Sequence, residues 1–116
     1  VLYENIINQI IDKLNFPVNI QNTVSMFHSF LETDISNESW FHTDSTKLGG
    51  VVYLNNVQPK DPTQHGTMIL YEKNKVIIPY EYNKLVLYDS KYIHRPMNGF
   101  GKDLNESRLT LNFFIR

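Results

Sequence analysis

The residues best suited to chemistry lie in one short run, Trp40-Phe41-His42-Thr43-Asp44. Residues i and i+2 of a β-strand point to the same face, so a strand over residues 40–44 would project His42 and Asp44 together. A neutral imidazole and a carboxylate can share a metal ion, and they form two thirds of a 2-His-1-carboxylate Fe(II) site. Such a site needs a second histidine, and a co-substrate would need a basic residue.

A His-x-Asp pair is weak evidence when it stands alone, because such pairs often arise by chance. Asp44 could instead cap a turn with Ser45 and Thr46. The interpretation as a metal site therefore depends on further residues that follow in a suitable order.

Two later histidines could complete the group. His65 stands in a Gln-His-Gly turn, where solvent exposure is expected, whereas His94 follows a predicted strand. We therefore favour His94 as the third ligand and keep His65 as the alternative. His28 lies in an early strand and is expected to be a wall residue, not a ligand.

Length and composition limit the possible classes of protein. At 116 residues the chain is expected to form one domain over residues 1–116. A net charge of -1 gives no reason to expect a nucleic-acid partner. The absence of cysteine excludes disulfides and thiolate metal sites.

The sequence contains neither a candidate membrane span nor a recognisable signal peptide. No apolar run approaches the roughly 20 residues that cross a bilayer, and the first residues lack a basic region. Together with the absence of cysteine, these features favour a cytoplasmic protein without a membrane partner.

Residues 2–14 are predicted to form a helix that packs against the rest of the protein. Apolar residues recur at helical spacing, and Pro17 prevents the helix from continuing. The apolar residues that would share one face of this helix are Tyr3, Ile6, Ile7, Ile10, Ile11 and Leu14.

After this stretch the apolar pattern changes to period two, which is typical of strands. Gly49-Gly50 is interpreted as a turn, and loops are expected over residues 32–39, 56–65 and 97–107. Several short strands separated by turn signals predict a mainly β protein, either a sandwich or a barrel. The expected strands cover residues 24–31, 40–44, 51–55, 66–71, 75–79, 84–90, 92–96 and 108–115.

The last predicted strand has one polar and one apolar face. Arg108, Thr110 and Asn112 share the polar face, yet the strand is too apolar overall to lie free in solvent. A polar face that points inward suits a barrel that holds a charged ligand. Arg108 could also form a surface ion pair with Glu106, an interaction that contributes little to stability.

The order of these motifs resembles that of the Fe(II)- and 2-oxoglutarate-dependent oxygenases, in particular their prolyl-4-hydroxylase-like branch. The resemblance extends from about residue 40 to residue 114. It implies a double-stranded β-helix, a cupin-like jelly-roll barrel over about residues 20–116, with the N-terminal helix packed on it. The motifs are Phe41-His42-Thr43-Asp44, Val52-Tyr53-Leu54-Asn55, His65-Gly66-Thr67, Ile93-His94 and Ser107-Arg108-Leu109-Thr110.

The resemblance also implies a ligand set. His42, Asp44 and His94 would bind Fe(II), with 2-oxoglutarate and O₂ as co-substrates and ascorbate as a further cofactor. Arg108 would bind the distal carboxylate of 2-oxoglutarate, because its planar guanidinium matches a carboxylate. The Tyr53 hydroxyl would add a hydrogen bond, and Thr110 and Asn112 would line the same pocket.

The implied reaction is hydroxylation of a C–H bond in a peptide side chain, an amino acid or a small metabolite. It is coupled to the oxidative decarboxylation of 2-oxoglutarate to succinate and CO₂. The presence of Asp44 argues against halogenation, because a halogenating site of this family lacks the carboxylate.

Some features depart from the family pattern and leave alternatives open. The interval from His94 to Arg108 is longer than usual, so Arg95 is a second candidate for the cationic contact, although it should point to the opposite face. Two other functions are also consistent with the sequence. One is a cupin-like metalloenzyme that does not use 2-oxoglutarate, and the other is a non-catalytic jelly-roll module that binds a metal or a ligand.

Overall fold

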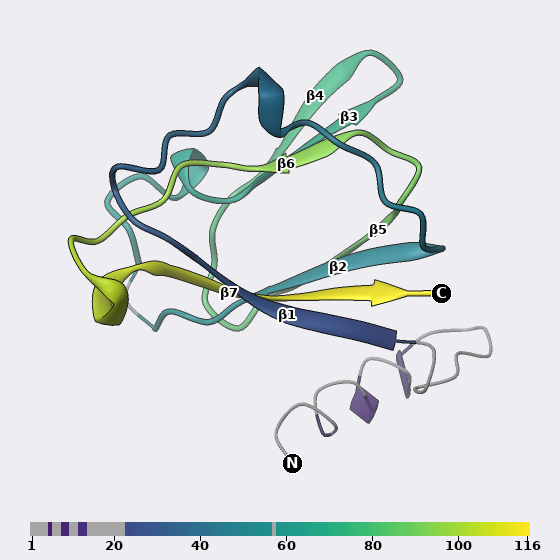
Figure 1. Cartoon of the computed structure of the whole chain (residues 1–116), viewed down its shortest axis with the longest axis horizontal. Helices are drawn as coiled ribbons and strands as arrows, with labels where there is room; N and C mark the ends of the chain where they lie inside the picture. Colours follow the sequence, from purple (N-terminus) through teal and green to yellow (C-terminus); the bar gives the residue numbers. More distant parts are fainter. Residues whose placement is uncertain (1–4, 6–7, 10–11, 14–22, 57) are drawn as a thin grey trace.

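The strands of the protein follow the period-two stretches of its sequence, as a computed structural model of the chain shows (Figure 1). The structure describes residues 23–56 and 58–116, together with positions 5, 8, 9, 12 and 13. Short 3-10 helices are η2 (Glu38–Trp40), η3 (Pro62–Gln64) and η4 (Leu104–Glu106). The strands are β1 (Thr23–Phe30), β2 (Leu48–Tyr53), β3 (Thr67–Tyr71), β4 (Asn74–Ile78), β5 (Leu85–Asp89), β6 (His94–Pro96) and β7 (Arg108–Ile115).

The strands form two antiparallel sheets, which confirms the prediction of a mainly β protein. The larger sheet has the order β1-β7-β2-β5, and the smaller has the order β4-β3-β6. In Figure 1, β3, β4 and β6 lie together on one side of the molecule, and β1, β2 and β7 lie together on the other. Because the chain passes repeatedly between the sheets, residues distant in sequence meet between them.

An apolar core fills part of the space between the sheets. Val51 and Tyr53 of β2 share a face, and they pack with Val86 of β5 and with Tyr80. The Tyr53 and Tyr80 rings lie 4.6 Å apart between centroids, within the range of a favourable aromatic pair. This core fixes β2 and β5 relative to the smaller sheet.

Strand β7 is buried on both faces. Arg108 and Thr110 are 1% and 0% exposed on the polar face. On the other face, Leu111, Phe113 and Ile115 are at most 2% exposed. The polar row therefore points into the protein, as its alternation predicts.

Gly49 and Gly50 do not form the predicted turn, because both belong to β2. Each lies opposite a large residue of β5 in the antiparallel register, with Gly49 paired to Tyr88 and Gly50 to Leu87. A Cβ at position 49 would lie 2.5 Å from Cε2 of Tyr88. The glycines therefore leave space for these side chains to lie over the β2 backbone.

The strand predicted over residues 40–44 is also absent, and this prediction was wrong. η2 ends at Trp40, and residues 41–44 are irregular apart from one bridge residue; the Asn37 side chain caps η2 by accepting a hydrogen bond from the Ser39 backbone N–H at 3.0 Å. Such a local side-chain contact competes with strand pairing. Within this segment an isolated bridge joins His42 to His94.

The helix predicted for residues 2–14 lies outside the residues that the structure describes, apart from isolated positions, and no N-terminal helix is among the elements defined there. In the described part of the chain, no helix has the length and apolar character needed to cross a membrane.

Substitution of Gly66 and Gly49 tests how closely neighbouring groups pack against these two glycines. A Cβ at position 66 would overlap the backbone carbonyl of Ile78, whereas one at position 49 would meet the Tyr88 ring. A ring can rotate aside more easily than a backbone can move. We expect Gly66→Ala to lower the free energy of unfolding by about 3 kcal/mol and Gly49→Ala by about 1 kcal/mol. Urea denaturation measures both, and a Gly66→Ala variant as stable as wild type would contradict the packing at this position.

Candidate metal centre

His42 and His94 are held side by side through their backbones. The His42 N–H donates to the His94 carbonyl at 3.1 Å, and the His94 N–H donates to the His42 carbonyl at 3.0 Å. Directly paired residues of antiparallel segments project to the same face. The two imidazole rings accordingly lie 4.4 Å apart between centroids.

The Asp44 carboxylate lies against both rings. The Asp44 N–H donates to the Ser90 carbonyl at 3.1 Å, which holds this residue beside the start of the His94 segment. Oδ1 is 3.6 Å from Nε2 of His42, and Oδ2 is 3.1 Å from Nε2 of His94. An octahedral ion with ligands at about 2.1 Å holds adjacent donors about 3 Å apart. His42, Asp44 and His94 could therefore hold a metal ion, as their donor atoms all lie within 4.8 Å of one another.

Backbone carbonyls determine which ring nitrogen faces the carboxylate. Nδ1 of His42 is 2.8 Å from the Trp40 carbonyl oxygen, and Nδ1 of His94 is 2.7 Å from the Tyr92 carbonyl oxygen. A carbonyl oxygen only accepts, so each neutral ring carries its proton on Nδ1 and presents the lone pair of Nε2. This is the usual arrangement around histidines that bind metals.

Asp44 Oδ2 is buried and has no hydrogen-bond partner among the described residues. It lies 3.1 Å from Nε2 of His94, which is itself an acceptor in the neutral ring. Facing acceptors repel unless a cation lies between them, and an unpaired buried carboxylate is costly. This orphaned oxygen fits a bound divalent ion.

The environment of His94 differs from that of His42. Burial lowers the pKa of His94, which keeps its imidazole neutral and able to bind a metal at neutral pH. The His94 side chain is 4% exposed, whereas that of His42 is 47% exposed. The site therefore opens to solvent on the side of His42.

A cavity of about 240 Å³ adjoins the ligand group. It lies between the sheets and reaches from the two histidines to the polar face of β7. Its wall consists of His28, Phe30, Trp40, His42, Val51, Thr67, Tyr88, His94, Pro96, Arg108, Thr110, Asn112 and Phe114.

Arg108 supplies a buried positive charge to this cavity. Its Nε donates to the His65 carbonyl at 2.6 Å, and its Nη2 donates to the Gly66 carbonyl at 2.8 Å. No carboxylate pairs with it among the described residues, Glu106 included. Burial lowers the pKa of Arg108 to about 10, so the side chain is still charged at neutral pH. A buried cation without an anionic partner suits an anionic ligand.

The other predicted pocket residues lie around Arg108. Thr110 donates to Oδ1 of Asn112 at 2.7 Å, and both side chains line the cavity. The Tyr53 hydroxyl is 2.7 Å from Oγ1 of Thr67, and Thr67, not Tyr53, reaches the cavity wall. The structure thus brings Arg108, Thr110 and Asn112 together and places Tyr53 directly behind them.

The alternative residues occupy other places. Nδ1 of His65 lies 2.8 Å from the Asn98 carbonyl, and its ring lines a separate cavity of about 650 Å³. Arg95 packs on the Phe41 ring, on the face opposite to the cavity. His28 lines the cavity as a wall residue; burial, and then the charge of Arg108, lowers its pKa.

Several residues of the site were not found from the sequence. The carbonyls of Trp40 and Tyr92 orient the histidines, but a backbone carbonyl has no signature in a sequence. Thr67 was quoted in the motif His65-Gly66-Thr67 at the start of a strand, but it was not predicted to line the pocket. Tyr88 lies 4.4 Å from the His94 ring, and the alternation of β5 could have identified it as an inward-facing residue.

A comparison of the sequence with models of known protein families finds no match. A search of curated proteins finds no match either. The function must therefore be argued from the residues of the site.

The two candidate histidines provide a direct test of the ligand group. His94→Ala removes one of three donors and should weaken Co(II) binding by more than about a hundredfold, beyond the loss typical of outer contacts. His65→Ala serves as the matched control and should change the affinity less than about twofold. Absorption titration with Co(II) measures both. Equal losses in the two variants would contradict the assignment of His94.

Asp44→Asn should have opposite effects on stability and on metal binding. The introduced amide can donate to Nε2 of His94 and removes an unpaired buried charge. The metal-free protein should therefore gain about 1 kcal/mol of stability, while Co(II) no longer raises its melting temperature. Thermal unfolding with a chelator and with Co(II) measures the two effects. A metal-free variant less stable than wild type would show that the carboxylate has a partner other than a metal.

Proposed function

We propose that this protein is an Fe(II)- and 2-oxoglutarate-dependent dioxygenase that hydroxylates a C–H bond. The observation that carries the proposal is that one cavity is lined both by the two histidines of a 2-His-1-carboxylate group and by a buried arginine, which has no carboxylate partner among the described residues. A metal site alone would suit many metalloproteins. An additional unpaired cation in the same cavity favours a co-substrate that has a carboxylate.

The path of the chain supports a double-stranded β-helix. Successive segments alternate between the sheets, except for the hairpin of β3 and β4, and β7 returns beside β1. The bridge at His42 adds a short edge segment to the smaller sheet next to β6. In a jelly roll, two sheets face each other in this way around a cavity.

The ligand group suits iron among the metals that an N/O donor set accepts. It offers imidazole and carboxylate donors without thiolate, and three protein ligands leave other positions of an octahedral ion free. When bound, Fe(II) would supply oxygen activation coupled to the oxidative decarboxylation of 2-oxoglutarate. His42, Asp44 and His94 would hold the ion, and the Trp40 and Tyr92 carbonyls would keep both rings in the binding tautomer.

The cationic end of the cavity would select the co-substrate. Arg108 is fixed by two carbonyls, and its remaining N–H groups would bind the distal carboxylate of 2-oxoglutarate. Asn112 accepts from Thr110, so its amide N–H groups are directed to other acceptors. Tyr53 would act through Thr67 and not through a direct hydrogen bond.

The primary substrate would approach from the exposed side of His42. This imidazole is the most accessible of the three ligands. The expected substrates are a peptide side chain, an amino acid or a small metabolite, which the loops over residues 32–39, 56–65 and 97–107 would select.

The test is an anaerobic titration of the metal-free protein with Fe(II) and then with 2-oxoglutarate. Chelation of iron by 2-oxoglutarate gives a weak visible charge-transfer band, and admission of O₂ should then release succinate. A band and succinate would support the proposal. Iron binding without the band would favour a cupin-like enzyme, and a band without succinate would favour a binding module.

Arg108→Lys should selectively weaken the binding of 2-oxoglutarate. Lysine keeps the charge but loses the planar fork. The dissociation constant should rise at least about tenfold, which corresponds to about 1.4 kcal/mol, while Fe(II) affinity stays unchanged. Titration of the visible band measures the constant.

Lys102→Met is the control for the loss of a positive charge, because Lys102 is exposed on a loop. Thermal unfolding should show that both variants are folded. An unchanged constant in folded Arg108→Lys would point to another cationic residue.

A further inference from the structure

The two histidines of the site depend on a short contact between their segments. An isolated bridge joins the segment of His42 to β6. The Asp44 N–H also donates to the Ser90 carbonyl, but Ser90 lies outside β6. The Trp40 and Tyr92 carbonyls orient the rings, but such a bridge alone would allow the two segments, and with them the imidazoles, to separate. Other side chains must therefore hold the segments together.

Phe41 and Arg95 lie on the back of this bridge. Because His42 pairs with His94 in an antiparallel bridge, the preceding Phe41 lies opposite the following Arg95. Both side chains point away from the face that carries the histidines. The Arg95 guanidinium carbon lies 4.2 Å from the centroid of the Phe41 ring, the geometry of a cation–π contact.

Arg95 has few other strong contacts. Its Nη2 is 3.8 Å from the sulfur of Met68, its partner in β3, and 4.0 Å from the exposed carboxylate of Glu38. Its Nε is buried without a hydrogen-bond partner among the described residues, and the side chain is 12% exposed. The guanidinium is thus held mainly between the Phe41 ring and Met68.

We propose that Phe41 and Arg95 are positioning residues that clamp the two histidine-bearing segments and so fix the separation of the metal ligands. His42, His94 and Ile69 lie side by side on three neighbouring segments. Phe41, Arg95 and Met68, each adjacent in sequence to one of them, form a parallel row whose side chains point to the opposite face. The clamp connects the loop of His42 through β6 to β3. The inference rests on the metal site of the proposed function but not on 2-oxoglutarate.

Simple electrostatics and the clamp predict opposite effects of removing Arg95. A positive charge near a divalent ion disfavours its binding, so the loss of this charge should tighten binding if only Coulomb forces act. The clamp predicts weaker binding, because the ligands lose their fixed separation. The sign of the change therefore distinguishes the two explanations.

The test is an absorption titration of the whole chain with Co(II), comparing wild type with Arg95→Met, Phe41→Leu and the double variant. Each single change should weaken Co(II) binding about tenfold, as outer contacts of metal sites do. The double variant should lose little more than either single variant, because one contact is removed in all three. The thermal midpoint of each metal-free variant reports any general loss of stability.

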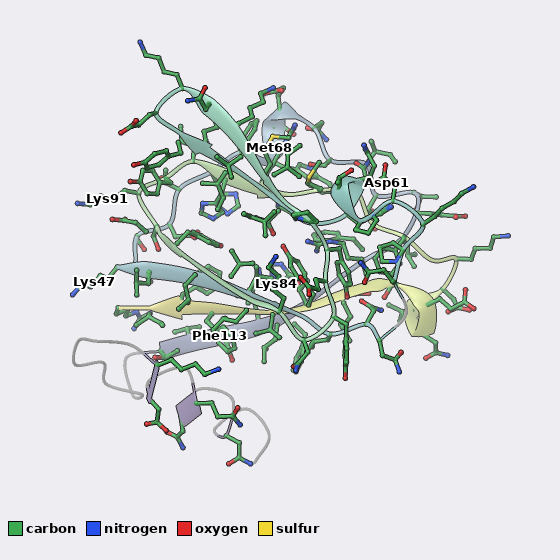
Figure 2. All side chains as sticks on the ribbon, turned by 180° about the vertical axis from the view of Figure 1, so that it is seen from behind. Lys47, Asp61, Met68, Lys84, Lys91 and Phe113 are labelled. Atoms are coloured by element: carbon green, nitrogen blue, oxygen red, sulfur yellow. The ribbon has the colours of Figure 1, made fainter. Side chains whose placement is uncertain are left out.

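Lys91→Met is the matched control, since it removes a charge in the turn before β6. Lys91 is exposed and extends from the edge of the molecule, whereas Met68 lies within the smaller sheet (Figure 2). The control should bind Co(II) as tightly as wild type or more tightly.

Unchanged or tighter binding in folded Arg95→Met would overturn the clamp. If that variant does not fold, Phe41→Leu decides the question, because it keeps the charge and removes the ring face. Wild-type protein that binds no Co(II) would overturn both the clamp and the proposed metal site. Wild-type binding with unaffected variants would overturn the clamp alone.

Discussion

The reciprocal hydrogen bonds between the backbones of His42 and His94 are the contact on which the site depends. They bring together two residues that are far apart in the sequence, because most of the strands are formed by the chain between them. Strands β2, β3, β4 and β5 lie between the two histidines in the chain, and they carry it away from His42 and back to His94. The fold can therefore be understood as the frame that makes this short bridge possible.

The two ends of the cavity attract ions of opposite charge. At one end, His42, Asp44 and His94 direct acceptor atoms at one point, which attracts a cation. At the other end, the buried guanidinium of Arg108 forms part of the cavity wall, and its positive charge attracts an anion. Burial strengthens both attractions, because the low dielectric of the interior screens charges poorly. A ligand that carries two carboxylates, one of them beside a keto group, could satisfy both ends.

The sequence was most informative where burial and alternation agree. The polar row of β7 was predicted together with the bounds of the strand, because one-residue shifts would expose its apolar partners. The donors His42, Asp44 and His94 were found from residue type and order, and the structure brings them together. Arg95 was correctly assigned to the opposite face by the same alternation.

The failures come from interactions that a sequence does not display. The glycines in β2 indicated a turn, but they lie in a strand, where they leave space for the cross-strand side chains of Tyr88 and Leu87. The run around His42 indicated a strand, but η2, capped by Asn37, occupies its start, and only an isolated bridge forms at His42. The carbonyls that orient the imidazoles belong to backbone geometry. The alternation of polar and apolar residues thus predicts which side chains face inward. Which groups these side chains contact depends on how the strands pair in the folded protein.

The same geometry implies a cost when no metal is bound. A carboxylate oxygen of Asp44 without a hydrogen-bond partner among the described residues faces the lone pair of the neutral His94 ring, and two acceptors cannot form a hydrogen bond with each other. A ligand at a hundred times its dissociation constant stabilises the folded state by about 2.7 kcal/mol. Metal binding would offset the strain of the empty ligand group, so the site and the fold are coupled. A rigid frame is then required for affinity as well as for catalysis, because a frame that relaxed around the empty group would lose the arrangement that a metal recognises.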